Sequence, residues 1–258
     1  MLDPGRLHSL RREVAQITTA GVFQTRSEPT LSLGVDSLDG ALGGGLVLSA
    51  VHEISPVAPM HTGTAVGFCV ALAALAAQHQ HALWIQQDCA AFEAGLPYGP
   101  GLALFGLAMP RLIILRVAQP RDALWAMEEA LKSGAVAIVL TELAKDGAGT
   151  DLTATRRLSL AAAEGRALGL ILRHRACDQP SAAATRWKVA AAPSRRDAFG
   201  GLGGDAFALS LVKNRRGPTG RWHLAWDHHE RAFVATLSLG VAQAARDRSN
   251  RVPFVRAG

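Results

Sequence analysis

The stretch "SPVAPMHTGT" (residues 55–64) comes closest to a phosphate-binding site in its residue types and spacing. It follows an apolar run and precedes a long apolar helical pattern, the place where a P-loop protein carries G-x-x-x-x-G-K-[ST]. Ser55, Pro56, Gly63 and Thr64 would be what is left of such a motif. The stretch is a degenerate nucleotide site, a different site, or only a turn.

The loop lacks the groups that bind phosphate. A P-loop wraps the phosphates with backbone N–H groups, while its lysine neutralises their charge. Pro56 and Pro59 have no N–H to donate, and the nearest lysine in the sequence is Lys132. Histidine is mostly uncharged near neutral pH, so His61 is a poor substitute for lysine. These residues predict that no nucleotide cofactor is bound.

Other chemistries have weaker support. The neighbours His228 and His229 would point to opposite faces of a strand, so they cannot share a metal ion. His79 and His81 lack cysteine or acidic partners at metal-ligand spacing. The sequence has no G-x-S-x-G motif, and none of its three cysteines carries a local signature for nucleophilic catalysis. We expect no metal site.

The charge is unevenly distributed along the chain. Residues 1–150 contain 9 basic and 13 acidic residues, and residues 151–258 contain 18 basic and 8 acidic ones, which gives the overall charge of +6. A basic second half favours a polyanion or an acidic protein as partner. The excess of arginine over lysine, 23 to 4, is also consistent with a simple compositional bias.

The apolar pattern predicts an α/β fold. Short continuous apolar runs that alternate with helical patterns are typical of a parallel sheet covered on both faces. The runs are residues 48–54, 82–86, 111–117, 135–140 and 169–173, and the helical patterns are residues 64–80, 101–107, 120–132 and 153–168. After Arg173, the segments "TRWKVAAAP", "AFALSLVKN", "GRWHLAWD" and "RAFVATL" predict antiparallel strands added to this sheet.

We expect one domain, residues 31–240, between an N-terminal helix with its linker (residues 1–30) and a basic, flexible tail (residues 241–258). The longest apolar stretch, residues 65–77, has 13 residues, fewer than the roughly 18 that span a bilayer. The N-terminus has no hydrophobic signal core, and the cysteines are odd in number and widely spaced. We therefore expect a cytoplasmic protein that does not contact a membrane.

Four stretches of the sequence carry a family resemblance: "LSLGVDSLDGALGGGL", "GPGLALFGLAMPRLIILRVAQPRDALWAMEEALKSGAVAIVL", "ATRWKVAAAPS" and "LVKNRRGPTGRWHLAWD". The chain resembles the RecA-like family and, more closely, its ImuA branch, over most of its length. ImuA proteins are accessory proteins found with an error-prone polymerase in bacterial mutagenesis cassettes. The resemblance implies a RecA-like core; the cell-division inhibitor SulA is a more distant, degenerate relative.

The resemblance also implies roles for two carboxylates. RecA-type loops resemble G-P-E-S-S-G-K-T, so Ser55-Pro56 takes the place of Gly-Pro and Gly63-Thr64 comes about three residues late. Asp88, in "WIQQD", takes the place of the catalytic glutamate, and Glu142, in "IVLTEL", that of the Mg²⁺-associated aspartate. The simpler interpretation, which we favour, is that both are solvated or capping carboxylates at strand ends. Without a phosphate cradle they do not make an ATPase, because the phosphates themselves bridge the metal.

Basic residues in two regions are candidates for DNA or partner binding. "VKNRRGP" is similar to a RecA stretch that reaches a nucleotide across the subunit interface, so its cations could bind a neighbour's nucleotide, nucleic acid or an acidic partner. Residues 175–205 match the region of the RecA DNA-binding loops, where Trp187 could stack on a base or face the core. The candidates are Arg186, Trp187, Lys188, Arg195, Arg196, Lys213, Arg215 and Arg216.

The resemblance implies a non-catalytic adaptor in SOS-induced mutagenic translesion synthesis, which acts near the nucleoid during DNA damage. Its implied partners are an ImuB-like inactive Y-family polymerase homologue, RecA, an error-prone polymerase III alpha-type subunit, single-stranded DNA and further copies of itself. Two alternatives remain open. One is a residual ATPase that uses Thr64, Asp88 and Glu142, and the other is a SulA-like inhibitor that binds a cell-division protein.

Overall fold

The computed structural model describes residues 28–144, 151–175, 179–194 and 203–236. The predicted N-terminal helix, the basic tail and the candidates Arg195 and Arg196 lie outside these residues.

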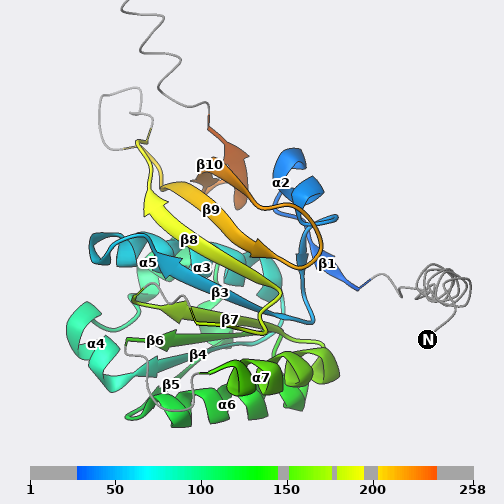
Figure 1. Cartoon of the computed structure of the whole chain (residues 1–258). Coiled ribbons are helices and arrows are strands. Elements are labelled where there is room, and N and C mark those ends of the chain that lie inside the picture. The colour runs from blue at the N-terminus through cyan, green and yellow to red at the C-terminus, as the bar shows by residue number, and fades with distance from the viewer. Residues whose placement is uncertain (1–27, 145–150, 176–178, 195–202, 237–258) are drawn as a thin grey trace, which may run out of the picture.

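A nine-stranded sheet, in the order β11-β10-β9-β8-β3-β7-β6-β4-β5, organises the fold (Figure 1). The strands from β8 to β5 in this order are parallel, and β9, β10 and β11 extend the sheet in antiparallel fashion. The parallel strands are β3 (Val51–Pro56), β4 (Ala82–Gln87), β5 (Leu112–Val117), β6 (Ile138–Leu143), β7 (Leu168–Arg173) and β8 (Thr185–Ala191). The antiparallel strands are β9 (Ala206–Asn214), β10 (Gly220–Asp227) and β11 (Ala232–Ala235).

Burial explains why the central strands are apolar along their whole length. Every residue of β3, β6 and β7 is buried, as expected for strands that helices cover on both faces. In contrast, β8 alternates between buried and partly exposed residues as far as Ala190, which is the pattern of a strand with one solvated face.

Helices α6 (Pro120–Ser133) and α7 (Leu152–Gly165) cover one face of the sheet. Pro120 lies in the first turn of α6, and Gly134 ends the helix with φ of +64°, a conformation that glycine adopts without strain. Asp151 caps α7 by accepting a hydrogen bond from the N–H of Ala154 at 2.9 Å.

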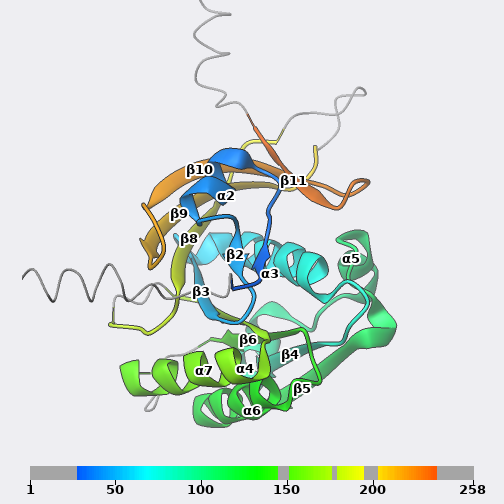
Figure 2. The same cartoon turned by 90° about the vertical axis from the view of Figure 1, so that its right-hand side faces the viewer.

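Helix α3 (Thr62–Ala77) covers the other face, where β9, β10 and β11 curl over it (Figure 2). Phe68 of α3 packs against Trp187, Phe207 and Phe233, with ring centroids 5.6–5.9 Å apart. The segment Pro59–Ala77 is long and apolar enough to cross a membrane. Core helices share that property, and α3 is enclosed by the sheet, so the segment is weak evidence for a membrane span.

The helical pattern predicted at residues 101–107 corresponds to α5 (Gly99–Leu104), and the stretch of residues 31–46 contains the short helix α2 (Asp36–Ala41). The elements that were not predicted are β1 (Thr30–Leu31), β2 (Leu46–Val47), α4 (Asp88–Ala94) and two single 3₁₀ turns, η1 (Pro59–His61) and η2 (Met109–Arg111). The β1–β2 pair depends on Gly45, whose φ is +124° and where a Cβ atom would lie 2.4 Å from the carbonyl oxygen of Leu31.

The predicted fold class is confirmed. The structure is a mixed α/β fold of the RecA-like type, with a mostly parallel sheet, helices on both faces and antiparallel strands at its C-terminal side. The boundaries differ by a few residues: β3 begins at Val51 rather than residue 48, and β6 at Ile138 rather than residue 135.

Candidate functional site

The loop between β3 and α3 lies where a RecA-like fold would hold the phosphates. It contains Val57, Ala58 and the turn η1, and α3 follows η1 directly. Pro56 and Pro59 lack an N–H, and the N–H groups of Val57, His61 and Thr62 are already bonded within the protein. Their acceptors are the carbonyl oxygens of Val189, Ala58 and Pro59. Most of the donors that would wrap a phosphate are therefore missing or engaged.

The start of α3 corrects the sequence reading of this loop. Gly63 and Thr64 lie inside the first turn of α3, because the helix begins at Thr62. Counted from that start, Thr62 takes the threonine position of the P-loop motif and His61 the lysine position, without any shift. The His61 ring turns to β8, where its Nδ1 accepts a hydrogen bond from the N–H of Ala191 at 3.3 Å. No cation of the loop is placed to face a phosphate.

Glu142 is a buried carboxylate held by other side chains. It is 1% exposed at the carboxyl end of β6. Its Oε2 accepts hydrogen bonds from Trp84 Nε1 at 3.2 Å and Gln86 Nε2 at 3.0 Å, and its Oε1 lies 2.7 Å from His174 Nε2. Such a network fixes the carboxylate in one orientation and offsets the cost of burying it. Burial and the charge of Glu142 together raise the pKa of the nearby Cys69 thiol, which makes that thiol unreactive.

Asp88 lies apart from Glu142, in the first turn of α4. Its carboxylate accepts a hydrogen bond from Arg116 of β5 at 2.6 Å, and both side chains are half exposed. An exposed pair of this kind stabilises a fold by at most about 1 kcal/mol. Asp88 is therefore a half-exposed carboxylate in the first turn of α4 that is paired with Arg116 of β5, and the structure does not join it with Glu142 in one site.

The predicted DNA-binding residues are partly internal. Trp187 is fully buried in the core, and its Nε1 donates to Thr185 Oγ1 at 2.7 Å, so the idea that it stacks on a base is wrong. Arg186 forms a hydrogen-bonded ion pair with the buried Glu53 at 2.8 Å. Lys213 donates to the carbonyl oxygen of Ser181. Desolvation, followed by the charges of Arg215 and Arg186, lowers the pKa of Lys213.

Three of the remaining candidates, Arg186, Lys213 and Arg215, lie close together, since the charges of Arg186 and Arg215 both act on Lys213. Arg186, at the start of β8, lies opposite Lys213, near the end of β9, at the amino-terminal edge of the parallel strands. Lys188 lies further along β8, opposite Ser55. Arg215 and Arg216 are exposed at the turn that follows β9, and Arg216 donates to the carbonyl oxygen of Gly43 at 3.2 Å.

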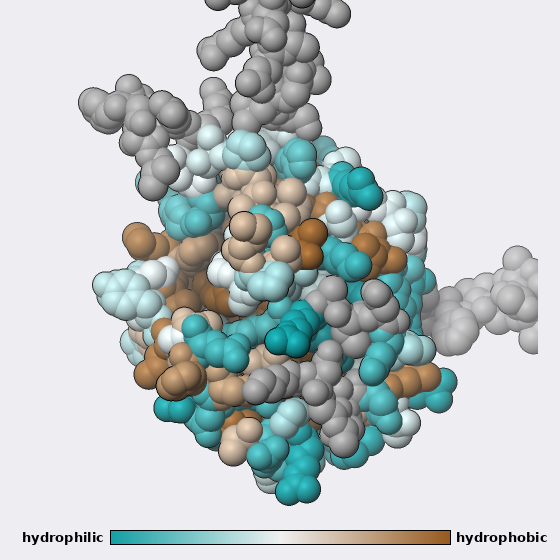
Figure 3. Space-filling model, turned by 60° about the vertical axis from the view of Figure 1, so that its left-hand side comes forward, coloured by the Kyte–Doolittle hydropathy of each residue, from teal (hydrophilic) through white to brown (hydrophobic). Residues whose placement is uncertain are grey.

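Two surface features were missed by sequence reasoning. One is the outer strand β5, whose side chains of Ile113, Ile114 and Leu115 are 38–49% exposed. The other is a hollow of about 290 Å³ between α3, the ends of β4 and β6, and the segment from α4 to α5. Figure 3 brings forward the side of the molecule where α4 and α5 lie in Figure 1, and it shows hydrophobic residues gathered beside a hollowed surface there. Clusters of apolar residues between Phe92 and Phe105 were the available signal for the hollow.

In the described residues, no group of three or more histidine, cysteine or acidic side chains could hold a metal ion.

No family model matches the chain. Two relatives named "Protein ImuA", from two strains of Caulobacter vibrioides, are each 32% identical to it over 212 residues. The match covers 76% of this chain and 83% of each relative. The chain belongs to the ImuA family. In this ImuA-family chain the loop after β3 contains no lysine, and three of its N–H groups are bonded within the protein.

Proposed function

We propose that the protein is a non-catalytic accessory protein of damage-induced mutagenic DNA synthesis, which binds other proteins through a RecA-like fold. By family resemblance its partners are an ImuB-like inactive Y-family polymerase homologue, RecA and an error-prone polymerase III alpha-type subunit. The protein would act in the cytoplasm, at the nucleoid during DNA damage. Self-association is a further proposed use of the same surfaces.

The observation that carries this proposal is the loop between β3 and α3. Two prolines, three internally bonded N–H groups and a histidine in the lysine position leave little to bind a phosphate. Removing the electrostatic clamp from a phosphoryl-transfer site costs orders of magnitude in rate. Glu142 supports the same conclusion, because its two oxygens already have three side-chain partners inside the protein.

We expect no saturable binding when the full-length protein is titrated with a fluorescent ATP analogue in the presence of Mg²⁺. The physical reason is the lack of N–H donors and of a cation in the loop. Isothermal titration with ATP and ADP at millimolar concentration gives an independent check. Saturable binding that Thr62→Ala abolishes would contradict the proposal and favour a residual ATPase.

The outer strand β5 is the surface best suited to a protein partner. Among the strands that the structure describes it pairs with β4 alone, so no described strand occupies its outer side, where a partner strand could be added. Natural proteins usually protect such edges with charges or proline, but residues 113–115 of β5 are Ile-Ile-Leu. A partner strand paired with β5 would cover this apolar edge.

Ile114→Lys is therefore expected to weaken capture of the ImuB-like partner about tenfold or more, which corresponds to about 1.4 kcal/mol. Val234→Lys is the matched control, because Val234 is 44% exposed on β11 at the opposite edge of the sheet and Ile114 is 43% exposed. Pull-downs with purified components measure the affinities, and thermal melts confirm that both variants fold. Equal losses in the two variants would rule out β5 as the docking edge.

Direct binding of single-stranded DNA has less support. Trp187 and Arg186 are engaged inside the protein, which leaves Arg215 and Arg216 as the exposed candidates in the described part of the chain. Binding through them would weaken with rising salt, since each phosphate contact releases counterions.

A further inference from the structure

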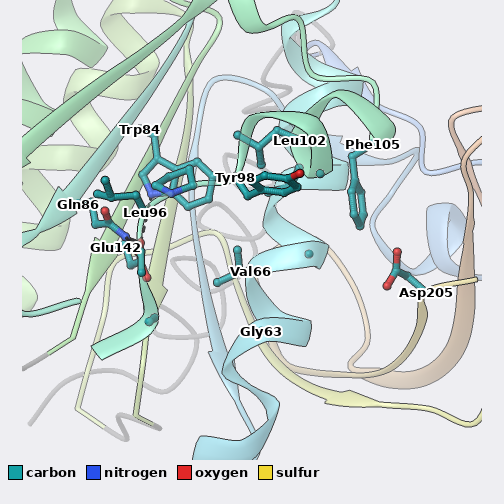
Figure 4. A pocket seen from close by; sticks show the side chains of 16 residues that line it. Gly63, Val66, Trp84, Gln86, Leu96, Tyr98, Leu102, Phe105, Glu142 and Asp205 are labelled. Carbon is teal, nitrogen blue, oxygen red and sulfur yellow. Dashed lines mark hydrogen bonds between the residues drawn. The ribbon is translucent and has the colours of Figure 1, made fainter. Parts of the chain in front are cut away.

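The hollow beside α3 has apolar walls and a polar floor (Figure 4). Its walls are formed by Val66 of α3, Leu96, Tyr98, Leu102 and Phe105. Tyr98 is 72% exposed and Leu96 is 62% exposed, although both have large apolar surfaces. A partly open apolar hollow of this size accommodates one large side chain with its neighbours.

An unpartnered polar atom lies at the floor. Gln86 is 2% exposed, and its Nε2 donates to Glu142 Oε2 at 3.0 Å and to the carbonyl oxygen of Gly95 at 3.1 Å. Its Oε1 is buried and has no hydrogen-bond partner among the described residues. This atom is enclosed within the protein, so the floor offers an occupant contact with the Gln86 side chain but no accessible acceptor at Oε1.

The charges on the lining are negative. Glu142 lies at the floor and Asp205 at the rim, and they are the charged residues among those that line the hollow. The fitting occupant therefore combines an aromatic or large apolar side chain with a neighbouring cation.

The chain itself contains such a segment. Residues 251–256 read "RVPFVR", with Phe254 between apolar neighbours and an arginine on each side. Pro253 restricts the backbone, which reduces the entropy lost when the segment binds.

The place where the described chain ends favours this occupant. The N–H of Thr236 bonds to the carbonyl oxygen of His223 in β10, and the N–H of Trp226, three residues further along β10, bonds to the carbonyl oxygen of Asp205. Three residues of a strand span roughly 10 Å, so the tail starts close to the rim of the hollow. The residues from 237 to 254 can span up to about 60 Å when extended.

We propose that this hollow is the docking site for residues 251–256 of the same chain, with Phe254 between Tyr98, Leu102 and Phe105. A flanking arginine faces Asp205, whose carboxylate is half exposed at the rim. The proposal does not depend on the identity of the partners or on the absence of nucleotide chemistry. Its consequence is that anything else that binds this hollow must displace the tail.

The test places a photo-crosslinking phenylalanine analogue at position 254 of the full-length protein at low concentration. We expect crosslinks from position 254 to peptides that contain residues 63–70 and 94–105, and no such crosslinks from the same probe at Ala245. Mixing isotopically heavy and light protein separates crosslinks within one chain from those between chains. Crosslinks that form only between chains, or that are no more frequent than those from position 245, would overturn the proposal.

Two variants of the hollow sharpen this test. A Cβ atom on Gly63 would have no neighbour within 4 Å, so Gly63→Leu fills part of the hollow without a clash at its Cβ. Gly40→Leu in α2 is the matched control, because Gly40 has equally open space and does not line the hollow. We expect Gly63→Leu to lower the crosslink yield about tenfold and Gly40→Leu to leave it unchanged. If Gly63→Leu fails to fold, Tyr98→Ala at an exposed position gives the same test; an unchanged yield with either folded variant would contradict the proposal.

Discussion

Replacing Glu53 by alanine is expected to lower the free energy of unfolding by about 3–5 kcal/mol, because it removes the carboxylate from a buried ion-pair network. Glu53 is 2% exposed in the central strand β3. Its Oε1 lies 3.2 Å from Arg173 Nη2 on β7, and its Oε2 lies 2.8 Å from Arg186 on β8. The carboxylate thus joins the three strands at the centre of the sheet, and its loss leaves two guanidinium groups in a site built for a negative charge.

Urea denaturation at pH 7 measures this effect. Asp88→Ala is the control, since it breaks the half-exposed pair with Arg116 and should cost at most about 1 kcal/mol. Glu53→Gln keeps hydrogen-bond acceptor capacity without the charge and should fall between the two. A loss below about 1 kcal/mol for Glu53→Ala would mean that the arginines relax into solvent and that the network does not hold the strands together.

The second large effect is a loss of stability in acid through His52. His52 is fully buried, and desolvation lowers its pKa from 6.5 to about 4, against the opposing effect of its hydrogen bond to the carbonyl oxygen of Val47. That bond, at 2.9 Å, places the proton on Nε2, because a carbonyl oxygen can only accept. Nδ1 lies 2.7 Å from Thr185 Oγ1, which donates to it while accepting from Trp187 Nε1. The native site therefore holds neutral histidine.

The sign of the pH dependence follows from this lowered pKa. Between pH 6.5 and 4 the unfolded chain binds a proton at His52 that the folded chain excludes, so stability falls as the pH is lowered through this range. The contribution is fully present above pH 6.5. From pH 7.5 to 4.5 it amounts to about 2–3 kcal/mol.

Denaturation of the wild type and of His52→Gln at pH 7.5 and 4.5 isolates this contribution from that of other groups. The wild type should lose about 2–3 kcal/mol more than His52→Gln over that range. His229→Gln alters a side chain that is 93% exposed and should keep the wild-type pH dependence. Parallel curves for the wild type and His52→Gln would show that His52 is not responsible.

The sequence predicts the regular part of the fold because its signals are local. Continuous apolar runs mark the buried parallel strands, and Pro120 and Gly134 mark the ends of α6. The alternation of residue types in β8 also indicates that Trp187 is buried. Thr185, Trp187 and Val189 share one face of the strand, while Arg186 and Lys188 point to the other. This period of two residues predicts that Trp187 lies in the core.

The candidate site was less predictable because its interactions join distant parts of the chain. Glu142 meets Trp84 and Gln86 across 58 and 56 residues, and Glu53 meets Arg186 across 133. The loop after β3 depends on where α3 begins, and a sequence pattern locates a helix start only to within a few residues. The pattern placed the helix start at Thr64 for that reason, whereas the helix begins at Thr62 and includes Gly63.

The position of β3 has a consequence for how the protein is made. Its two neighbours in the sheet, β7 and β8, begin only at Leu168 and Thr185. A ribosome that adds about 5–20 residues per second needs roughly 5–20 s to extend the chain from the end of β3 to β7. For that time β3 and the apolar helix beside it lack β7 and β8, although β4, β5 and β6 can already pair with one another. Chains that stall or are cut before residue 168 would expose β3 and that helix, and chaperones would have to shield this segment during synthesis.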